Sequence, residues 1–227
     1  MELEILNINY NCILFFIFNL LLIKFIFMAR FLIVSLCCFV ISTLSQSQNQ
    51  SFAIKNDKIL VIVAHPNFDK SRVNASLISR LKGRKDITVH NLYSKYENFQ
   101  INTEKEITLL KKYDKIVIQF PMMWYSAPPL LKLWIDQVLT KIAHSENFLK
   151  DRKIMLVVTC GGKYIKYVKS NDNKYSINEL LSPLEETFKY LGMKQIKPFY
   201  IFNTPEITDD QLVQYGQNYV KEIVAQY

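Results

Sequence analysis

Residues 116–136 read IVIQFPMMWYSAPPLLKLWID, and this stretch indicates how the whole chain is organised. The apolar run at residues 116–120 is typical of a buried strand, and it ends at Pro121 because proline donates no hydrogen bond within a sheet. Pro128 and Pro129 mark the start of a helix, since proline is tolerated in a first helical turn. Four large side chains lie between these boundaries, namely Met122, Met123, Trp124 and Tyr125. Ligands of open α/β sheets bind at the carboxyl ends of the strands, so this loop predicts a site for a flat aromatic ring system.

Apolar runs alternate with helical patterns along the rest of the chain. Continuous apolar runs at residues 58–64 (KILVIVA) and 153–159 (KIMLVVT) are typical of strands buried on both faces. The runs at residues 87–93 and 195–202 are expected at the sheet edges, because the first alternates with polar residues and the second contains Pro198. Five strands alternating with five helices predict an α/β fold with a doubly wound parallel sheet and helices on both faces. Two edge strands at these positions fit the order 2-1-3-4-5, the flavodoxin-like arrangement.

Capping residues mark the starts of several predicted helices. Ser71 precedes one helix, and Thr103 with Glu106 matches the capping-box pattern at the start of another. Further helices are expected at residues 128–140 and 176–191 and after Thr208. Pro183 either breaks the second of these helices or lies within it, and Gly192 ends it.

The N-terminal part of the chain differs sharply in composition from the rest. Residues 12–44 are almost entirely apolar, and a stretch of roughly 20 such residues is enough to cross a bilayer as a helix. Two interpretations compete: the segment is a membrane anchor, or translation starts at Met28 and residues 31–44 belong to a secretory signal peptide. A third is an upstream extension without a role in the mature protein. We therefore expect a signal or anchor with a polar linker in residues 1–54, a folded domain in residues 55–227, and a membrane-associated or secretory location, with a cytoplasmic location as the alternative.

The chain of 227 residues carries a formal net charge of +8. Residues 1–54 contain two basic and two acidic residues, which leaves 26 basic and 18 acidic residues in the domain. This excess could attract anionic nucleotides or an acidic membrane face, or form only a solvated lysine-rich surface. Basic residues do not cluster with aromatic ones, so nucleic-acid binding is not expected. Of the four cysteines only Cys160 lies in the domain, and the spacing of cysteines and histidines predicts no metal site.

The loop after the first predicted strand has the features of a phosphate site. It spans residues 65–74 and ends at the N-terminus of a helix, where free backbone amides and the helix dipole favour an anion. His65, Ser71 and Asn74 are the candidate side-chain donors. A helix cap and a turn would also explain Ser71, but they do not explain a histidine placed directly after a strand.

The loop after the fourth predicted strand contains Gly161 and Gly162, which let a backbone approach a ligand closely. Such a pair is most often only a turn, and no glycine-rich nucleotide-binding motif is present. In the aromatic loop, we expect Trp124 and Tyr125 to contact a ligand rather than to cap the core. Trp134, on the following helix, is expected in the core instead.

Five segments of the chain resemble, in order and spacing, the NAD(P)H:quinone oxidoreductase family. This is the DT-diaphorase-like group, which includes bacterial modulators of drug activity and the ancillary flavoproteins of potassium-efflux systems. The segments are AHPNFDKSRVNASL (64–77), NLYSKYENFQIN (91–102), VIQFPMMWYSAPPLLKLWIDQVL (117–139), VVTCGG (157–162) and YSINELLSPLEETFKYLGM (175–193). The resemblance covers residues 58 to about 203, and its most specific part is the pattern Q-F-P-x-x-W-Y-S-x-P.

The resemblance implies a flavoprotein with FAD, or with FMN as in some members, that takes hydride from NAD(P)H and reduces a quinone. It also implies a homodimer with the active site at the subunit interface. By motif position, phosphate and ribityl contacts are implied for His65, Ser71 and Asn74. Contacts to the isoalloxazine ring are implied for Pro121, Met122, Met123, Trp124 and Tyr125. Contacts to the pyrimidine side are implied for Thr159, Gly161 and Gly162, and a cover over the ring for Tyr164 or Tyr167.

The chain departs from the family pattern in three places. Where the family usually has a Gly-Phe-Ala-Tyr-Gly-like loop that walls the nicotinamide and quinone pocket, residues 141–145 read KIAHS. His144 in this loop either replaces the pocket tyrosine as a proton donor or is an exposed loop histidine. The pocket histidine of the mammalian enzymes has no counterpart between Lys163 and Lys174. The hydrophobic N-terminal segment is also foreign to the family.

The residues and the resemblance together leave several functions open. The leading one is a ping-pong, two-electron reduction of a quinone-like acceptor by NAD(P)H through the flavin. An azo- or nitroreductase would use the same flavin. A regulatory flavoprotein that docks on a membrane transporter belongs to a different class, which the N-terminal segment and residues 141–145 favour. A degenerate nucleotide-binding module is disfavoured, because all three predicted cofactor loops are intact.

Overall fold

The computed structural model describes residues 57–145, 147–170 and 173–225 and, in the N-terminal part, residues 15–22, 24–26, 28, 30, 32–33 and 35–36. The chain divides into two units, Met1–Lys55 and Asn56–Tyr227. The described residues of the first unit are helical. The second unit contains the predicted strands and loops.

The expected membrane-associated or secretory location is wrong. That prediction depended on residues 12–44, and no helix in the described part of the chain combines the length and the apolar character needed to cross a bilayer. Residues 37–56, where the predicted signal segment ends and the folded domain is expected to begin, lie outside the described residues.

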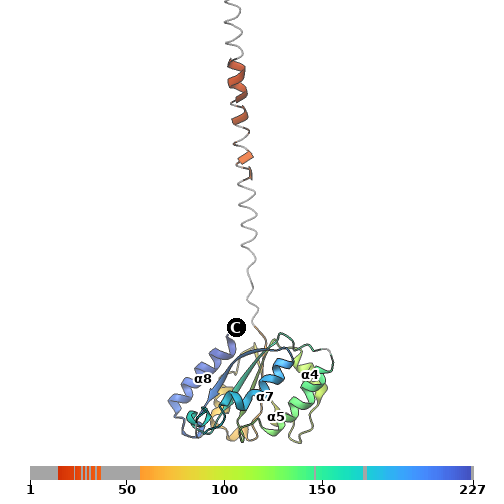
Figure 1. Cartoon of the computed structure of the whole chain (residues 1–227), viewed down its shortest axis with the longest axis vertical. Coiled ribbons are helices and arrows are strands. Elements are labelled where there is room, and N and C mark those ends of the chain that lie inside the picture. The colour runs from red at the N-terminus through yellow and green to blue at the C-terminus, as the bar shows by residue number, and fades with distance from the viewer. Residues whose placement is uncertain are drawn as a thin grey trace, which may run out of the picture. The chain divides into compact units, whose positions relative to one another are not determined.

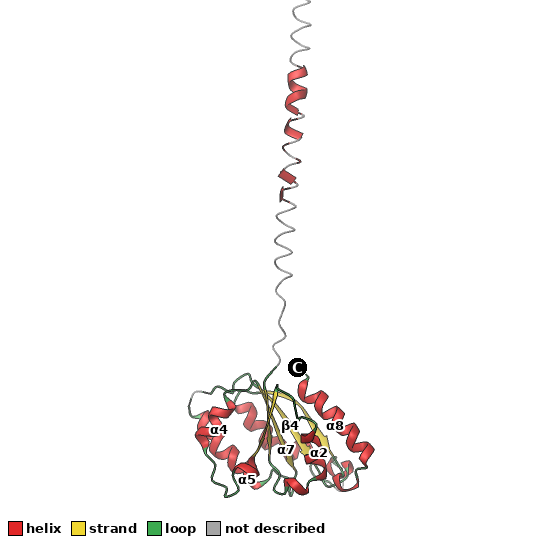
Figure 2. Ribbon diagram, turned by 180° about the vertical axis from the view of Figure 1, so that it is seen from behind, coloured by secondary structure: helices red, strands yellow, loops and turns green. Residues whose placement is uncertain are grey.

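Within the described residues, the second unit is built on one parallel sheet of five strands (Figures 1 and 2). The strands are β1 (Ile59–Val63), β2 (Ile87–Asn91), β3 (Lys115–Pro121), β4 (Lys153–Thr159) and β5 (Lys194–Ile201). They are hydrogen-bonded in the order β2-β1-β3-β4-β5. The predicted flavodoxin-like sheet is therefore confirmed, with β2 and β5 at its edges as their sequences indicate.

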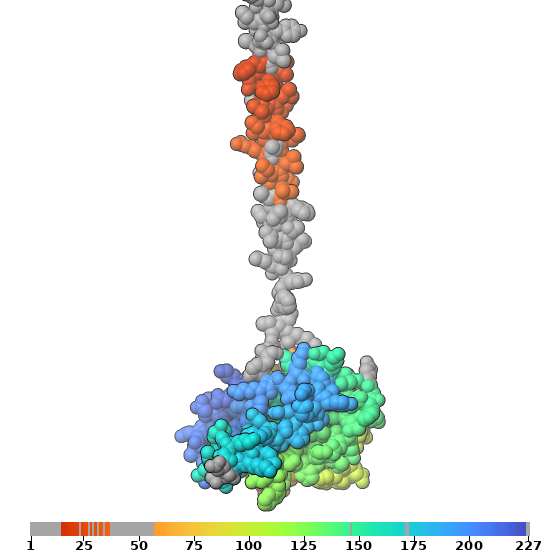
Figure 3. All heavy atoms as spheres, in the orientation of Figure 1, coloured from red at the N-terminus to blue at the C-terminus, as the bar shows by residue number. Residues whose placement is uncertain are grey.

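Helices cover both faces of the sheet. On one face, α2 (Arg72–Ser79) and α8 (Asp209–Val224) pack with every second residue of β1, starting at Ile59. The opposite face carries α3 (Leu92–Lys95), α4 (Thr103–Leu110), α5 (Pro129–Trp134), η2 (Ile135–Leu139), α6 (Thr140–Ala143) and α7 (Ile177–Tyr190). Leu60 of β1 packs on this second face, because successive side chains of a strand point to opposite sides. In Figure 3 the C-terminal residues, in blue, form a large part of the surface of the second unit on the side shown.

Most helix boundaries follow the capping residues of the sequence. The hydroxyl of Ser71 accepts a hydrogen bond from the backbone N–H of Asn74 at 3.3 Å and so begins α2. Ser176 and Thr208 begin α7 and α8 with complete capping boxes. Pro183 lies inside α7 without breaking it. The helix expected at residues 128–140 is observed as α5, η2 and α6, in which η2 is a π-helical segment.

The capping box predicted at Thr103 and Glu106 is wrong. Helix α4 is capped one residue earlier, by Asn102, whose side chain accepts the N–H of Lys105 at 3.0 Å. Asn102 is an equally good capping residue, and Glu106 is occupied elsewhere: its side chain is 2% exposed and turned into the core.

The buried carboxylate of Glu106 is fully hydrogen-bonded. It accepts from Tyr96 Oη at 2.5 Å and from Trp134 Nε1 at 2.8 Å, and it bonds His90 Nε2 at 3.0 Å. A buried charge is tolerated only when it is compensated in this way. The core position predicted for Trp134 is confirmed, and its indole N–H has a partner there.

Candidate functional site

A pocket of about 400 Å³ opens at the carboxyl ends of β1, β3 and β4. Its lining residues are His65, Asn67, Lys70, Ser71, Arg72, Val73, Asn74, Pro121, Met122, Thr159, Gly161, Thr204 and Pro205. Seven of these lining residues were predicted as site residues, and they come from all three predicted loops. The parallel sheet brings the loops together, because adjacent strands end at the same edge.

The N-terminus of α2 forms one end of this pocket and suits an anion. The backbone amides of Arg72 and Val73, the first two residues of α2, have no acceptor within the helix. The helix dipole adds positive potential at this end, and Lys70 also lines the pocket. Among the described residues that line it, none is an aspartate or glutamate. These features match a phosphate group better than a cation or a neutral sugar.

Arg72 fixes the position of this helix end. Its Nη1 donates to the carbonyl oxygen of Ile207 at 2.5 Å, and its Nη2 pairs with Asp209 in the first turn of α8. Asp209 thus partly compensates the charge of Arg72. The same contacts hold the start of α2 next to the start of α8.

His65 is held in one protonation state by its neighbours. Its Nδ1 accepts a hydrogen bond from the backbone N–H of Asn67 at 3.1 Å. Burial lowers the pKa of His65 below its ordinary value. The neutral ring therefore carries its proton on Nε2, which leaves that nitrogen as a hydrogen-bond donor.

Asn74 joins two hydroxyl groups at the floor of the pocket. Its buried Nδ2 donates to Ser71 Oγ at 3.1 Å and to Thr159 Oγ1 at 3.0 Å. Its Oδ1 accepts from Gln119 Nε2 at 3.0 Å. Because Thr159 shares an amide with Ser71, its hydroxyl lies beside the anion end of the pocket rather than apart from it.

The aromatic loop is a tight turn in an unusual conformation. Met123 and Ser126 exchange two backbone hydrogen bonds of 2.9 and 3.0 Å. Between them Trp124 and Tyr125 have φ values of 46° and 64°, which makes this a turn of the type that normally carries Asn-Gly. A bulky residue in this region costs on the order of 1–3 kcal/mol. Trp124 is 93% exposed and Tyr125 59%, so neither side chain gains burial that would offset the strain.

Strained backbone of this kind is concentrated at functional sites. Trp124 and Tyr125 do not line the 400 Å³ pocket themselves, but they directly follow Pro121 and Met122, which do. Met123 is also exposed. The predicted contacts of these three residues with a flat ligand therefore stay predictions that the geometry of the turn favours.

Tyr164 and Tyr167, predicted to cover a ring, occupy different environments. Both lie in the 3₁₀ turn η3 (Tyr164–Tyr167) after the Gly161–Gly162 pair. Tyr167 is buried against Gly162, where a Cβ would lie 3.2 Å from its ring, and its ring packs on Phe202 with centroids 5.4 Å apart. Tyr164 is exposed. Tyr167 thus supports the glycine loop, and only Tyr164 is accessible to a ligand.

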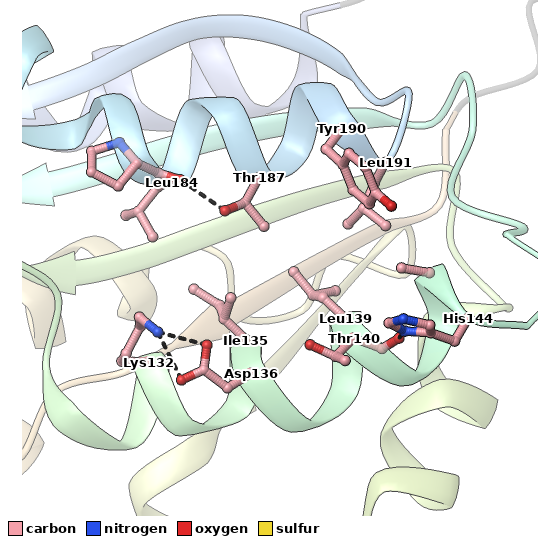
Figure 4. Close-up of a pocket in the computed structure, with 12 residues that line it drawn as sticks. Lys132, Ile135, Asp136, Leu139, Thr140, His144, Leu184, Thr187, Tyr190 and Leu191 are labelled. Carbon is pink, nitrogen blue, oxygen red and sulfur yellow. Dashed lines mark hydrogen bonds and ion pairs between the residues drawn. The ribbon is translucent and has the colours of Figure 1, made fainter.

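His144 lies in another part of the molecule. It lines a separate groove of about 300 Å³ between the α5–η2–α6 segment and α7. Figure 4 shows His144 and Tyr190 at one end of this groove, with the ion pair of Lys132 and Asp136 at the other. His144 Nδ1 bonds the carbonyl oxygen of Thr140 at 2.8 Å. Within one chain, the structure does not bring His144 to the pocket at the strand tips.

Several pocket residues were not predicted from the sequence. These are Asn67, Lys70, Arg72, Val73, Thr204 and Pro205. Lys70 and Arg72 flank the predicted cap Ser71, so their charge was a usable signal. Thr204 and Pro205 follow the edge strand β5, and no local pattern marks them. Gln119 lies behind the pocket as a polar residue within the apolar run at residues 116–120, which indicates that it has a buried partner.

Residues 57–223 match the family model described as Flavodoxin-like fold. The chain belongs to this family. Within the flavodoxin-like family, similar curated proteins include an uncharacterised NAD(P)H oxidoreductase, YrkL, of Bacillus subtilis, which is 38% identical over 75% of this chain and 99% of its own length. The glutathione-regulated potassium-efflux system ancillary protein KefF of Salmonella typhi is 32% identical over 74% of this chain and 96% of its own. The suspected resemblance is thereby confirmed.

Solved structures of flavodoxin-like proteins give the same picture of the fold. General stress protein 14 of Treponema denticola in complex with FMN has a TM-score of 0.67 and 32% identity over 73% of this chain and 97% of its own. An NADPH-quinone reductase from P. pentosaceus has a TM-score of 0.68 and 27% identity over 75% and 99%. A structure described as a thermophilic tryptophan halogenase has a TM-score of 0.70 and 33% identity over 74% and 99%.

Proposed function

We propose that the second unit is a flavin-dependent NAD(P)H oxidoreductase that binds FMN and reduces a quinone-like acceptor by two electrons. The observation that carries this proposal is the pocket at the tips of β1, β3 and β4. It combines the amides of a helix N-terminus, two hydroxyl groups and no carboxylate at one end with an exposed aromatic turn beside it. The first part suits a phosphate, and the second suits a flat ring. Relatives named NAD(P)H oxidoreductase support the nicotinamide co-substrate.

We assign FMN as the cofactor in place of FAD, which the resemblance put first. The comparisons support a flavin and give no preference to FAD, whereas a structure with 32% identity contains FMN. The pocket also presents the N-terminus of α2 with two free amides, at Arg72 and Val73. That arrangement matches one phosphate monoester.

When bound, the flavin supplies the ring that accepts hydride and later gives up two electrons. The residues of this chain bind and orient it. Ser71, Thr159 and the first amides of α2 hold the phosphate end, and Nε2 of His65 is a further donor there. The backbone N–H groups of Trp124 and Tyr125 are not used in the two hydrogen bonds of the turn, so they are free to face acceptor atoms of the ring. Fixed amide donors stabilise negative charge that develops on such a ring.

The identity of the acceptor is the finer part of this proposal. A quinone is supported by the similar NADPH-quinone reductase, and an azo- or nitroreductase would use the same site. The structure described as a halogenase has comparable identity, so likeness at this level does not fix a substrate. The homodimer implied by the resemblance likewise stays a prediction.

The relatives named KefF favour a second candidate function. Those proteins are called ancillary to a potassium-efflux system, which supports a role for this chain as a flavoprotein that docks on a membrane transporter. Turnover would then be slow, and partner binding rather than quinone reduction would be the main activity.

One spectroscopic experiment tests the proposed function. The purified full-length chain is incubated with FMN, desalted and mixed anaerobically with NADH or NADPH. We expect a yellow protein that bleaches with at least one of the two and regains its colour on addition of a quinone. A colourless protein that retains no flavin would refute the proposal. Bleaching without recovery by quinone would favour the transporter-associated role.

A further inference from the structure

Five side chains form a continuous hydrogen-bonded chain from α8 to the pocket. Tyr219 Oη donates to Gln119 Oε1 at 2.5 Å, and Gln119 Nε2 donates to Asn74 Oδ1 at 3.0 Å. Asn74 Nδ2 then donates to Ser71 Oγ at 3.1 Å and Thr159 Oγ1 at 3.0 Å. Tyr219 and Gln119 are fully buried and lie on α8 and β3, behind the pocket that Ser71 and Thr159 line.

Each of the two side-chain amides in this hydrogen-bonded series, Gln119 and Asn74, fits its neighbours in two orientations. Rotating the amides of Gln119 and Asn74 by half a turn reverses every donor and acceptor without moving a heavy atom by much. In the reversed arrangement Tyr219 would accept, Asn74 Oδ1 would face the two hydroxyls, and Ser71 and Thr159 would have to donate to it. The distances alone do not distinguish these two arrangements.

Tyr219 decides between them. Within the described part of the chain, its hydroxyl has Gln119 as its one hydrogen-bond partner. Burial raises the pKa of Tyr219, so its hydroxyl keeps its proton. If Tyr219 accepted from Gln119, a buried O–H would be left without an acceptor, at a cost of the full desolvation of that group. The O–H of Tyr219 therefore donates to Gln119. Every hydrogen bond of the series is then donated in the direction from α8 to the pocket.

This direction determines what the pocket offers a ligand. Ser71 Oγ accepts from both the side-chain and backbone nitrogens of Asn74, and Thr159 Oγ1 accepts from the side chain. Each hydroxyl then has a proton that no group in the described part of the protein accepts, and Ser71 and Thr159 both line the pocket. Together with the free amides of α2, they form a set of donors. A ligand group made only of acceptors, such as a phosphate dianion, satisfies this set.

We propose that Tyr219, acting through Gln119 and Asn74, is a positioning residue that turns the hydroxyl protons of Ser71 and Thr159 towards the ligand and so selects a phosphorylated flavin. This inference rests on the proposed function, because it assigns a specificity determinant to the same pocket. The inference goes beyond the proposed function because it gives Tyr219, on α8 behind the pocket, control over which flavin is bound.

The test compares FMN with riboflavin, which is the same ring and ribityl chain without the phosphate. Dissociation constants of both flavins for the full-length apo-protein are measured by quenching of flavin fluorescence. Tyr219→Phe keeps the buried ring and removes the hydroxyl, so the direction of the amides is no longer fixed. We expect FMN binding to weaken about tenfold, the size expected for a charge-assisted hydrogen bond, and riboflavin binding to change much less.

Tyr215→Phe is the matched control. Tyr215 lies one turn earlier on α8, packs on the same apolar cluster and has no hydrogen bond to the chain of five side chains. This variant should keep the wild-type ratio of the two dissociation constants. Thermal unfolding of each apo-protein is recorded in parallel, so that a loss of folding is not mistaken for a loss of selectivity.

Gln119→Glu provides a second variant. A carboxylate at this position accepts from Tyr219 and from Asn74 Nδ2, which turns Asn74 Oδ1 towards the hydroxyls and draws their protons inward. We expect the preference for FMN over riboflavin to fall further than in Tyr219→Phe. If the wild type binds neither flavin, the proposed function itself fails. If the wild type prefers FMN but Tyr219→Phe keeps that preference, or loses both flavins equally, Tyr219 has only a structural role and the inference is overturned.

Discussion

Tyr125 occupies a backbone conformation that few side chains of its size adopt. Its φ of 64° and that of Trp124, 46°, place two adjacent bulky residues in the left-handed region. Asparagine tolerates this region far better than tyrosine does, because its short side chain can bond the local backbone. The sequence thus keeps aromatic groups at this turn where a more stable choice is available.

We predict that Tyr125→Asn raises the free energy of unfolding of the apo-protein by about 0.5–1 kcal/mol, through relief of this strain. The same change should weaken FMN binding, because an aromatic contact is lost. Urea denaturation and flavin titration measure the two effects. Tyr175→Asn is the control, since Tyr175 is also about half exposed and lies outside the positive-φ residues. A loss of stability in both variants alike would contradict the assignment of strain.

Sequence reasoning succeeded for residues whose role is local. His65 directly follows a strand, Ser71 caps a helix and Pro121 ends a strand, and each of these features can be read from immediate neighbours. Tyr219 could not be found in this way, because its partner Gln119 is 100 residues away in the sequence. The resemblance implied Tyr164 or Tyr167 as a cover over the ring, and only packing against Gly162 shows that Tyr167 is buried.

At Gly216 of helix α8, the side chain of Arg80, which ends α2, occupies the space that a Cβ would take. A Cβ added at Gly216 would lie 1.9 Å from Nε of Arg80. This nitrogen is buried and, among the described residues, has no hydrogen-bond partner. The close approach of the two helices therefore depends on the pair Gly216 and Arg80.

A double-mutant cycle tests this crossing. Gly216→Ala should lower the free energy of unfolding by about 1–2 kcal/mol through overpacking, although alanine is the better helix former. In an Arg80→Ala background the same change should instead be neutral or stabilising by up to about 1 kcal/mol, because only the helix propensity remains. Equal effects of Gly216→Ala in the two backgrounds would contradict the proposed contact. Urea denaturation measures all four proteins.

At the level of elements, the sequence predicted types and order better than details. The strands were found because their apolar runs are long enough to be buried on both faces. Glu106 was wrongly predicted to be a capping residue, because the capping-box pattern can be seen within four consecutive residues. Its actual partners, His90, Tyr96 and Trp134, come from three other segments and cannot be seen locally. The π-helical segment η2 could not be predicted either, since nothing in IDQVL separates it from an ordinary helical turn.

Lys115 connects the sheet to the end of the chain. It is fully buried at the start of β3, and its Nζ donates to the carbonyl oxygen of Ile223 at 2.7 Å near the C-terminus of α8. Burial, together with the nearby charge of Lys153, lowers the pKa of Lys115 to about 8 from its ordinary value of 10.5. The stability of the whole domain should therefore depend on pH in the alkaline range.

The sign of this dependence follows from proton binding. Below about pH 8 Lys115 is protonated in both the folded and the unfolded state, and between about pH 8 and 10.5 only the unfolded chain keeps the proton. Stability rises with pH where the unfolded state binds more protons. We predict that the difference in free energy of unfolding between wild type and Lys115→Met grows by about 1–2 kcal/mol in favour of the wild type between about pH 7.5 and 9.5. A constant difference, measured by urea denaturation at both pH values, would contradict the lowered pKa.

The series of hydrogen bonds from Tyr219 to Ser71 also has a consequence for biosynthesis. Its members span residues 71–219, so synthesis must pass α8 before all five side chains can come together. The donors at the pocket floor take their final orientation only after this helix has packed. Selective capture of the phosphorylated cofactor is then expected only after synthesis has passed residue 219 and α8 has folded against the sheet.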